Sequence, residues 1–556
     1  MSEPIPAKQP LRIIPIGGLG EIGKNMTCFV YGRQAIIIDT GIMFPTQDMP
    51  GIDYILPDFR PLLDLDLQLL GILYTHAHED HIGAVSHVLD AFPNAPLFAT
   101  PLTAALLEVK LKNSRSKHPA NIHVFQAGDC LELGPFRAES FHVTHSIPDC
   151  VGYGLHTPQG LVVFTGDYKF DNTPIDGPAS DFARLASWGR EGVRLLLADS
   201  TNADTPGWTP SEKVVEAAFD RVFHQAKGRI MVATFASVIS RIQLAANTAE
   251  RYGRKLAIAG RSMQGNVRRA RELGILRIPD RTLIPLNEAK HLPAEQLVLM
   301  VTGSQGEPAA VLGRLAKGNH PQITVQEGDT IVLSSHPIPG NEEMVYRTIN
   351  NLIQRGAEVI YNQLEEVHVS GHACQEEMKL MLHLTQPEYF IPVHGELRHL
   401  SQHAKLAKEA GVCEANILMV ENGCVVELDE NGLWERERLP GGYVYVSGAG
   451  VGEIGPAILR ERESLARSGF FLVAAQVSAL SGELLGEPEI ISRGFVHLQD
   501  SAETRALIRK TVASVLANHA ELPIGKRRKR LQENIARIIH QETRRKPFLL
   551  CLLYEC

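Results

Sequence analysis

A dense set of metal-binding residue types follows a predicted buried strand early in the chain, and it constrains the fold more than any other feature. The strand is the apolar run Leu69–Tyr74, and the next seven residues read THAHEDH. Imidazole and carboxylate side chains are ligands that suit Zn²⁺ or Mn²⁺. The candidate ligands in this segment are His76, His78, Asp80 and His81.

The spacing of these four residues predicts two divalent metal ions. Alternation along an extended segment brings His76 and His78 to one side, whereas Asp80 and His81 turn onto a following loop or helix start and can face a second ion. One ion cannot comfortably use all four side chains. The alternative is a solvated polar loop, which the density of ligands directly after an apolar strand disfavours.

Polar residues also occur at the ends of other predicted strands in the first half of the chain. The runs Phe141–Thr144, Leu161–Phe164 and Leu195–Ala198 each end at or near an aspartate or a histidine. This repetition predicts a site built along one edge of a sheet.

The pattern of the chain changes at about residue 208 and returns at about residue 375. In between, predicted helices Ser211–Lys227 and Ile239–Arg251 flank the strand Arg229–Thr234, which indicates a mostly parallel sheet covered on both faces. Beyond it, Phe390–Val393 is another strand that ends at a histidine. The Gly-rich stretch Ser447–Ile454 is predicted to be a linker that leads into a small α/β unit.

Composition excludes several classes of protein. The 556 residues suggest about three folding units, and 44% hydrophobic with 21% charged residues exclude a largely disordered or fibrous chain. No apolar run approaches the roughly 18 residues that span a bilayer, and the N-terminus does not resemble a secretory signal, so no membrane is expected. Eight scattered cysteines without a C-x-x-C pair favour reduced thiols in the cytoplasm. The net charge of −8 argues against a general polyanion binder, although a local groove or bound metal can supply positive charge.

The histidine cluster matches the H-x-H-x-D-H signature of the metallo-β-lactamase superfamily. The resemblance implies that Asp39 orients the histidine loop, that His145 is a further ligand, and that Asp167 joins the two ions. It also assigns the last ligand to His394, although a lone histidine at a strand end is usually structural. His142 competes with His145, but residues three apart on a strand point to opposite faces. The resemblance selects His145.

Further motifs resemble the β-CASP group of that superfamily. Asp199–Ala203 resembles its motif A, His368–Ala373 its motif B, and Val393–Glu396 its motif C, where a histidine is typical of RNA-processing members. Three more segments are similar to the ribonuclease J family, of bacterial type, and the resemblance runs in order from about residue 10 to 450. These segments are Gly17–Asn25, Val301–Pro308 and Ser334–Glu342.

This resemblance implies an α/β fold, a metallo-β-lactamase αββα sandwich with an inserted α/β β-CASP domain and a small C-terminal α/β domain. The expected boundaries are residues 1–207 and 375–450 for the two parts of the metallo-β-lactamase domain, and 208–374 for the β-CASP domain. Residues 451–464 are expected to be a linker and 465–556 the C-terminal domain.

The resemblance also implies a metal-dependent ribonuclease that acts on single-stranded RNA in RNA maturation and decay. It is expected to be a 5′-to-3′ exonuclease that prefers 5′-monophosphate ends and leaves 5′-phosphate products, with endonuclease activity as a further expectation. Two divalent ions are expected in each subunit, and the ligands accept Zn²⁺ and Mn²⁺ alike. A homodimer or homotetramer is usual for the family, and partner proteins of an RNA-decay complex are also expected.

The chemistry indicates which residues act on the substrate. Attack on a phosphodiester places negative charge on its non-bridging oxygens, which a pair of cations can offset. The leaving 3′-oxygen needs a proton, and His372 is the candidate general acid because it belongs to the inserted domain and would face the metals. The alternative is a loop histidine that caps backbone groups. Asp80 and Asp199 complete the expected catalytic set.

Two groups of residues are candidates for RNA binding. The resemblance places Ser304, His336, Ser370 and His372 near the 5′-monophosphate nucleotide, whereas by pattern alone these Gly/Ser turns are common loops. Basic side chains are a second group, which could track an RNA backbone or form a solvated helix face. These are Arg241, Arg261, Arg268, Arg269, Arg271 and, in the tail, the run Lys526–Arg530.

Three other functions compete with this interpretation. A small-molecule hydrolase, such as a lactamase or thioesterase, shares the histidine cluster but needs neither the insertion nor His372. A DNA-processing β-CASP nuclease is disfavoured by His394 in motif C. A catalytically silent RNA-binding scaffold is disfavoured by the complete ligand set.

Overall fold

The computed structural model describes residues 9–46, 48–114, 116, 118–338, 340–495 and 502–556. The chain divides into two compact units, one of Met1–Phe44 with Ile55–Tyr443 and one of Pro45–Tyr54 with Val444–Cys556. Parts of the predicted domains 1–207 and 465–556 lie outside the described residues, as does Pro339 within the segment Ser334–Glu342.

The first unit contains two large sheets that face each other across one core. Phe29, Ile36 and Leu73 from one sheet and Tyr153 and Leu195 from the other belong to a single buried apolar cluster. The eight-stranded sheet has the order β22 (Gly432–Arg438), β21 (Cys424–Asp429), β1 (Leu11–Gly17), β3 (Met26–Tyr31), β4 (Gln34–Ile38), β6 (Gln68–Leu73), β7 (Leu97–Ala99) and β8 (Ile122–Val124). The six-stranded sheet has the order β19 (Tyr389–Val393), β13 (Val193–Asp199), β12 (Gly160–Phe164), β11 (Val151–Thr157), β10 (Phe136–His142) and β9 (Cys130–Leu133).

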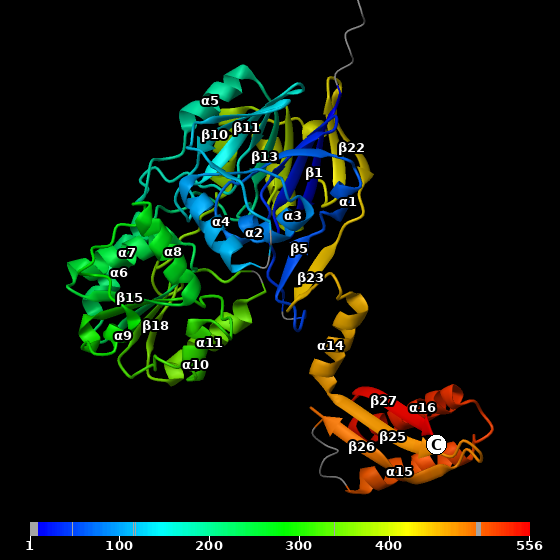
Figure 1. Ribbon diagram of the computed structural model, residues 1–556. Coiled ribbons are helices and arrows are strands. Elements are labelled where there is room, and N and C mark those ends of the chain that lie inside the picture. The colour runs from blue at the N-terminus through cyan, green and yellow to red at the C-terminus, as the bar shows by residue number, and fades with distance from the viewer. Residues whose placement is uncertain (1–8, 47, 115, 117, 339, 496–501) are drawn as a thin grey trace, which may run out of the picture. The chain divides into compact units, whose positions relative to one another are not determined.

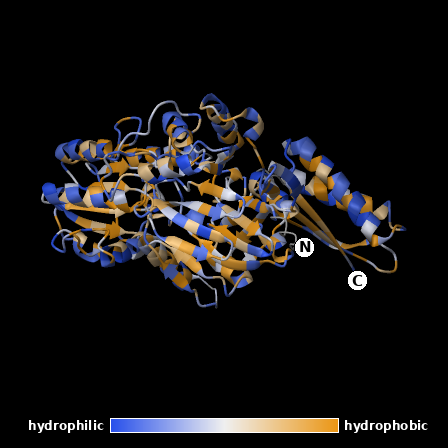
Figure 2. Cartoon of the chain, turned by 90° about the horizontal axis from the view of Figure 1, so that it is seen from above, coloured by the Kyte–Doolittle hydropathy of each residue, from blue (hydrophilic) through white to orange (hydrophobic). Residues whose placement is uncertain are grey.

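Helices cover the outer faces of the two sheets (Figure 1), and Figure 2 shows hydrophobic residues concentrated along the strands between them. This arrangement confirms the predicted αββα sandwich. The helices of this part are α1 (Arg60–Leu63), α2 (Glu79–Ile82), α3 (Val85–Ala91), α4 (Pro101–Asn113), α5 (Phe182–Glu191), α12 (Gln375–Thr385) and α13 (Leu397–Glu409).

The inserted segment folds around its own five-stranded parallel sheet. All four residues of its central strand, β14 (Ile230–Ala233), are buried, so both faces are covered as predicted. The other strands are β15 (Lys255–Ala259), β16 (Leu297–Val301), β17 (Thr330–Leu333) and β18 (Glu358–Ile360). Its helices are α6 (Lys213–Gln225), α7 (Ile239–Arg251), α8 (Arg261–Glu272), α9 (Leu286–Ala289), α10 (Val311–Lys317) and α11 (Glu342–Gln354).

Parallel pairing in the sandwich brings strand ends together at one edge. β13 pairs in parallel with both β12 and β19, and Asp199 lies opposite Val393. β4 pairs in parallel with β6, so the residues that follow both strands also meet. The short strands β2 (Leu19–Gly20) and β20 (Gly395–Glu396) pair next to this edge. Polar residues at these ends therefore converge, as the sequence predicted.

The second unit has a three-stranded sheet with helices packed on one face. The sheet order is β26 (Leu484–Arg493), β25 (Phe470–Val477) and β27 (Phe548–Glu555). Phe471 and Val473 share a buried cluster with residues of α15 (Ala502–Ala517) and α16 (Ile524–Thr543). The unit begins with a hairpin of β23 (Tyr443–Ser447) and β24 (Gly450–Val451), followed by α14 (Pro456–Ser468). β5 (Tyr54–Pro57) lies at the boundary between the two units.

The linker predicted at Ser447–Ile454 is more ordered than its composition suggested. Gly448 lies in the turn between β23 and β24, Gly450 begins β24, and α14 occupies most of the predicted linker 451–464. α14 has no buried residue, which is compatible with a connecting role. The domain boundaries themselves stay predictions. Across the described part of the chain, none of the helices combines the length and apolar composition that crossing a lipid bilayer requires.

Candidate metal centre

Histidine and aspartate side chains gather where the strands of the two sheets end. The segment after β6 carries His76, His78, Asp80 and His81, while His145 follows β10, Asp167 follows β12, and His394 follows β19. Among the described residues, three groups of four donor atoms result, and the atoms of each group lie within 4.8 Å of one another. The first group is His76, His78, His145 and Asp167, and the second is Asp80, His81, Asp167 and His394. The third group is Asp167, Asp199, His372 and His394.

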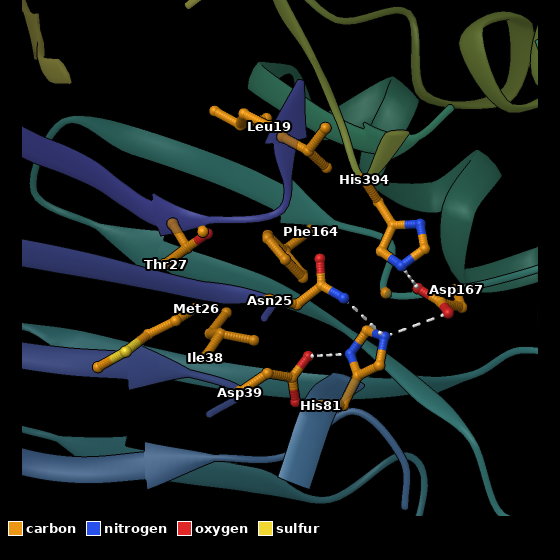
Figure 3. A pocket seen from close by; sticks show the side chains of 13 residues that line it. Leu19, Asn25, Met26, Thr27, Ile38, Asp39, His81, Phe164, Asp167 and His394 are labelled. Carbon is orange, nitrogen blue, oxygen red and sulfur yellow. Dashed lines mark hydrogen bonds and ion pairs between the residues drawn. The ribbon is translucent and has the colours of Figure 1, made fainter. Parts of the chain in front are cut away.

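Asp167 belongs to all three groups and is the one residue that the first two share; it is 3% exposed. Its Oδ2 lies 3.2 Å from His81 Nε2 and 3.7 Å from both His76 Nε2 and His145 Nε2, while its Oδ1 lies 3.5 Å from His394 Nε2. Figure 3 shows Asp167 between the rings of His81 and His394. A carboxylate in this position can bridge two cations.

The environment of one imidazole nitrogen shows that these residues suit divalent cations. His394 Nε2 is buried and has no hydrogen-bond partner among the described residues, and it lies 3.5 Å from carboxylate oxygens of both Asp80 and Asp167. A buried imidazole nitrogen that points at carboxylates and has no hydrogen bond is suited to coordinate a cation. Four nitrogen and oxygen donors in each group match the ligand number of zinc sites.

Neighbouring oxygens hold the other ring nitrogen of three histidines. Asp39 Oδ2 lies 2.8 Å from His81 Nδ1, and Asp39 also accepts from the Thr75 backbone and hydroxyl. Thr201 Oγ1 lies 2.6 Å from His394 Nδ1, and the Gly371 carbonyl lies 2.7 Å from His145 Nδ1. Each contact directs Nε2 at the centre, where His81 Nε2 also lies 3.2 Å from Asn25 Nδ2 and His145 Nε2 lies 3.2 Å from His78 Nδ1. The position of Asp39 agrees with the predicted orienting role, while Thr201 was not singled out from the sequence.

Charge and burial divide the histidines into two classes. Burial holds the pKa of His76 and His145 well below the usual range and lowers the pKa of His78 to about 4. Burial also opposes protonation of His81 and His394, but nearby carboxylates, above all Asp167, raise the pKa of both well above the usual range. When no cation is bound, these carboxylates therefore favour the protonated form of His81 and His394.

Metal uptake should release protons as a result. A cation must displace the protons of His81 and His394, because a histidine binds metal in its neutral form. Metal affinity should therefore fall as pH decreases below the raised pKa values of these two histidines. Titration calorimetry of Mn²⁺ at pH 6 and pH 8, in buffers with different ionisation enthalpies, measures both effects. Equal affinity at both pH values with no proton release would contradict this expectation.

His372 belongs to the third donor group, beside the two groups proposed for cations, and comes from motif B of the inserted segment. Its Nδ1 is 2.7 Å from Asp199 Oδ2, and its Nε2 is 4.0 Å from Asp167 Oδ2. Its ring stacks on that of His394 with centroids 5.4 Å apart. Burial opposes protonation, but the Asp199 carboxylate raises the pKa of His372. The side chain is 20% exposed, so it lies at the open side of the centre.

The comparisons with known proteins agree with this geometry. Four family models match the chain: the metallo-beta-lactamase superfamily at residues 19–211, the ribonuclease J beta-CASP domain at 227–352, the Zn-dependent metallo-hydrolase RNA specificity domain at 357–419, and the ribonuclease J C-terminal domain at 457–556. Ribonuclease J of Synechocystis is 40% identical over 98% of this chain and 87% of its own length. The chain belongs to the ribonuclease J family. Ribonuclease J of Thermus thermophilus is 41% identical over 98% of this chain and 95% of its own length.

A solved structure from Enterococcus faecalis, titled as a protein of unknown function, shares the fold with a TM-score of 0.53 at 15% identity. It covers 75% of this chain and 100% of its own. The family match confirms the resemblance drawn from the sequence. Together with the donor groups, the metallo-hydrolase match indicates that this ribonuclease J family member uses divalent metal.

The predicted phosphate-binding residues lie on connected loops. Gln305 Nε2 donates to the His336 carbonyl at 2.7 Å, which ties the loops of Ser304 and His336 together. The rings of His336 and His368 are 5.4 Å apart, and two residues later the Ser370 hydroxyl accepts from the His372 backbone at 3.1 Å. Ser304 Oγ is buried, and the part of the chain that the structure describes offers it no hydrogen-bond partner.

His142 lies outside the donor groups. Its Nε2 is 3.0 Å from the Pro178 carbonyl, whereas His145 belongs to the first donor group. The choice of His145 agrees with this geometry.

The basic candidates have different environments in this family member. Arg261 and Arg268 are exposed, while Arg269 pairs with Glu108 and Glu272, and Arg271 pairs with Asp280. In the tail, Arg527 is 5% exposed and bonds to the Gly482 carbonyl and Glu555, whereas the rest of the run Lys526–Arg530 is exposed.

Arg241 does not fit the predicted role of tracking an RNA backbone, because its side chain is 1% exposed. It donates to Glu212 Oε2 at 2.7 Å and to the Val367 carbonyl at 2.6 Å. The helical pattern of its sequence surroundings could not distinguish a solvated face from this buried ion pair.

Replacing Arg241 by methionine should destabilise the fold strongly. The change keeps an apolar chain of similar volume but leaves Glu212, 3% exposed, with the Lys169 amine at 3.6 Å as its remaining cation. Breaking a buried pair from one side costs about 3–5 kcal/mol. Urea unfolding followed by tryptophan fluorescence measures the change.

Arg271→Met is the matched control. It removes a pair with Asp280 at the surface and should cost at most about 1 kcal/mol. If both variants lost the same free energy of unfolding, the buried Arg241 pair would stabilise the fold no more than a surface ion pair does.

Proposed function

We propose that this protein is a two-metal ribonuclease that hydrolyses phosphodiester bonds of single-stranded RNA. The observation that carries the proposal is the pair of four-donor groups joined by Asp167, with His372 at their open side. Family membership supports RNA as the substrate, since the relatives are named ribonuclease J and one matched model is an RNA specificity domain.

His76, His78, His145 and Asp167 would hold one divalent cation, and Asp80, His81, Asp167 and His394 the other. Zn²⁺ and Mn²⁺ both suit these ligands. When bound, such a pair neutralises charge on the phosphate and activates water. The chain contributes orientation, because Asp39 and Thr201 hold His81 and His394 by their Nδ1 atoms.

His372 acts as the general acid. Asp199 accepts a hydrogen bond from Nδ1 and favours the protonated ring, so Nε2 can give a proton to the leaving 3′-oxygen. The bond between phosphorus and that oxygen breaks as the bond to water oxygen forms. The scissile phosphate therefore stays on the 5′ end of the shortened RNA. Each released nucleotide leaves with a 3′-hydroxyl and the 5′-phosphate that it already carried.

The direction of cleavage is proposed to be 5′ to 3′ from a 5′-monophosphate, with endonuclease activity in addition, in RNA maturation and decay. Ser304, His336, Ser370 and His372 are the residues proposed to bind the terminal nucleotide. The buried hydroxyl of Ser304 supports this assignment, because no described residue pairs with it and it can donate to a phosphate oxygen.

The test is an assay on a 5′-monophosphorylated, 3′-labelled single-stranded RNA with added Mn²⁺. Wild type and His78→Ala are compared on this RNA, on the same RNA with a 5′-triphosphate, and on a DNA copy. We expect mononucleotide release from the monophosphate RNA with wild type and none with His78→Ala.

Internal fragments independent of the 5′ end would remove the exonuclease assignment, and equal rates on DNA would favour a DNA-processing nuclease. Turnover of a chromogenic lactam without RNA cleavage would favour a small-molecule hydrolase, and tight RNA binding without cleavage a scaffold.

We further propose a cytoplasmic homodimer or homotetramer with partners in RNA decay. All eight cysteines are free thiols, which supports a reducing compartment.

In the second unit, the sheet face opposite α15 and α16 carries Leu472 beside Leu550, which is 38% exposed. This apolar face is open to a second copy of the chain. Leu550→Asp should lower the molar mass measured by light scattering after size-exclusion chromatography, and an unchanged mass would contradict this interface.

A further inference from the structure

Glu377 in the first turn of α12 joins three separate segments of the chain with one buried carboxylate. The residue is 0% exposed. Its Oε1 accepts from the Phe170 backbone N–H at 2.7 Å, and its Oε2 accepts from those of Thr209 at 2.7 Å and Cys374 at 2.9 Å. A capping box explains the bond to Cys374, which precedes the helix, but not the other two.

The two additional bonds reach the segments that carry the proposed chemistry. Phe170 lies three residues after Asp167, on the loop that leaves β12. Thr209 lies where the chain enters the inserted domain, and Cys374 lies two residues after His372, where the chain returns to the sandwich. The Glu377 carboxylate therefore connects the loop of Asp167 to the two segments, at Thr209 and Cys374, where the chain passes between the sandwich and the inserted domain.

Thr209 extends this connection to His372 itself. Its hydroxyl donates to the His372 carbonyl at 2.7 Å, while Glu377 holds its backbone N–H. Asn202 Nδ2 donates to the same carbonyl at 3.1 Å. The peptide that presents the His372 ring is thus fixed from the sandwich side, and its Nε2 lies 4.0 Å from Asp167 Oδ2.

The chemistry of the group explains why a carboxylate occupies this position. Within the described residues Glu377 has no ion-pair partner, so its charge is stabilised by three N–H donors and the N-terminus of α12. A glutamine can accept on one oxygen only, and its amide N–H₂ would then face an N–H donor. Glutamine in this position therefore satisfies the donors on one side of the group and repels those on the other.

We infer that Glu377 is a positioning residue for hydrolysis. By fixing the segments of Thr209 and Cys374 relative to the loop of Asp167, it keeps His372 opposite Asp167. The inference rests on the proposed function, because it assigns the effect of Glu377 to proton donation by His372. A merely structural role predicts a loss of stability alone.

The experiment compares Glu377→Gln with wild type on two RNAs that differ in one atom. One has the ordinary 3′-oxygen at the scissile bond, and the other has sulfur in its place, which leaves as a thiolate without needing a proton. On the ordinary RNA we expect kcat to fall about 10- to 100-fold, as for other groups that orient a catalytic side chain, with KM and metal content close to wild type. On the sulfur-containing RNA, the kcat of Glu377→Gln should nearly equal that of wild type. His372→Ala should show the same rescue, whereas the ligand variant His78→Ala should not.

Two further variants separate positioning from stability. Asp329→Asn removes another buried carboxylate, 2% exposed, that accepts from the Gln326 backbone N–H at 2.8 Å and pairs with Arg229 at the start of β14 and β17. It should lower the melting temperature to a similar extent but leave kcat unchanged. Thr209→Val removes only the hydroxyl that holds the His372 carbonyl, and it should reproduce the kcat deficit and its rescue even if Glu377→Gln folds poorly.

Each outcome decides the inference. Wild-type kcat in both Glu377→Gln and Thr209→Val would overturn it, and so would a deficit that persists undiminished on the sulfur-containing RNA. If wild type cleaves neither RNA, the proposed function fails instead, so the two failures are distinguishable.

Discussion

Asp167→Asn is expected to abolish loading of two ions and to reduce RNA cleavage by about 10³-fold or more. Asp167 is the shared member of both four-donor groups, and an amide is a poor substitute for a bridging carboxylate. A bound ion stabilises the charge of the transition state by several kcal/mol, and each 1.36 kcal/mol is about a tenfold change in rate. Metal content after dialysis, measured by plasma mass spectrometry, should fall from two ions to at most one.

The matched control is Asp176→Asn. Asp176 bonds to Ser240 outside the donor groups, and burial raises its pKa to about 6, so the amide resembles its protonated form. This variant should keep both ions and cleave RNA within a few-fold of wild type. Retention of two ions and of the wild-type rate in Asp167→Asn would contradict the bridging role.

The part of this centre that the sequence could predict is the part that is local. His76, His78, Asp80 and His81 lie in one short segment after an apolar strand, so their chemistry and their spacing are visible together. His394 is different, because 313 positions separate it from His81, and only the parallel pairing of β13 with β19 brings it to the same edge. For such distant ligands the resemblance to a family was necessary, since no periodicity encodes which strands become neighbours.

The features that sequence reasoning missed depend on burial. Arg241 and Glu377 are charged residues on helices, and charge on a helix usually faces solvent. Both are instead buried where the inserted domain joins the sandwich, and tertiary partners decide this. The hairpin at Ser447–Ile454 was missed for another reason, because glycine is common both in linkers and in tight turns between strands.

His372→Ala should lower kcat about 10²- to 10⁴-fold, the range for loss of a general acid, while both metal ions stay bound. Retention of metal is expected because the two groups proposed to hold the cations, His76, His78, His145, Asp167 and Asp80, His81, Asp167, His394, are complete without His372. KM should change little if binding of the RNA depends mainly on other contacts. Single-turnover cleavage of the 5′-monophosphate RNA, together with metal analysis, measures both quantities.

The pH dependence of the wild-type rate identifies the proton donor. The Asp199 carboxylate raises the pKa of His372, so the protonated, active form persists above the usual range for histidine and is lost as pH rises through the raised pKa. The rate of wild type should therefore fall at high pH, and His372→Ala should lack this decline. The control is His142→Ala. His142 ends β10, and its Nε2 lies 3.0 Å from the Pro178 carbonyl, so this variant should keep the wild-type rate and profile. If His372→Ala retained the decline at high pH, the donor would be another group, and Asp199 would serve to orient His394 alone, whose Nδ1 lies 3.2 Å from its other oxygen.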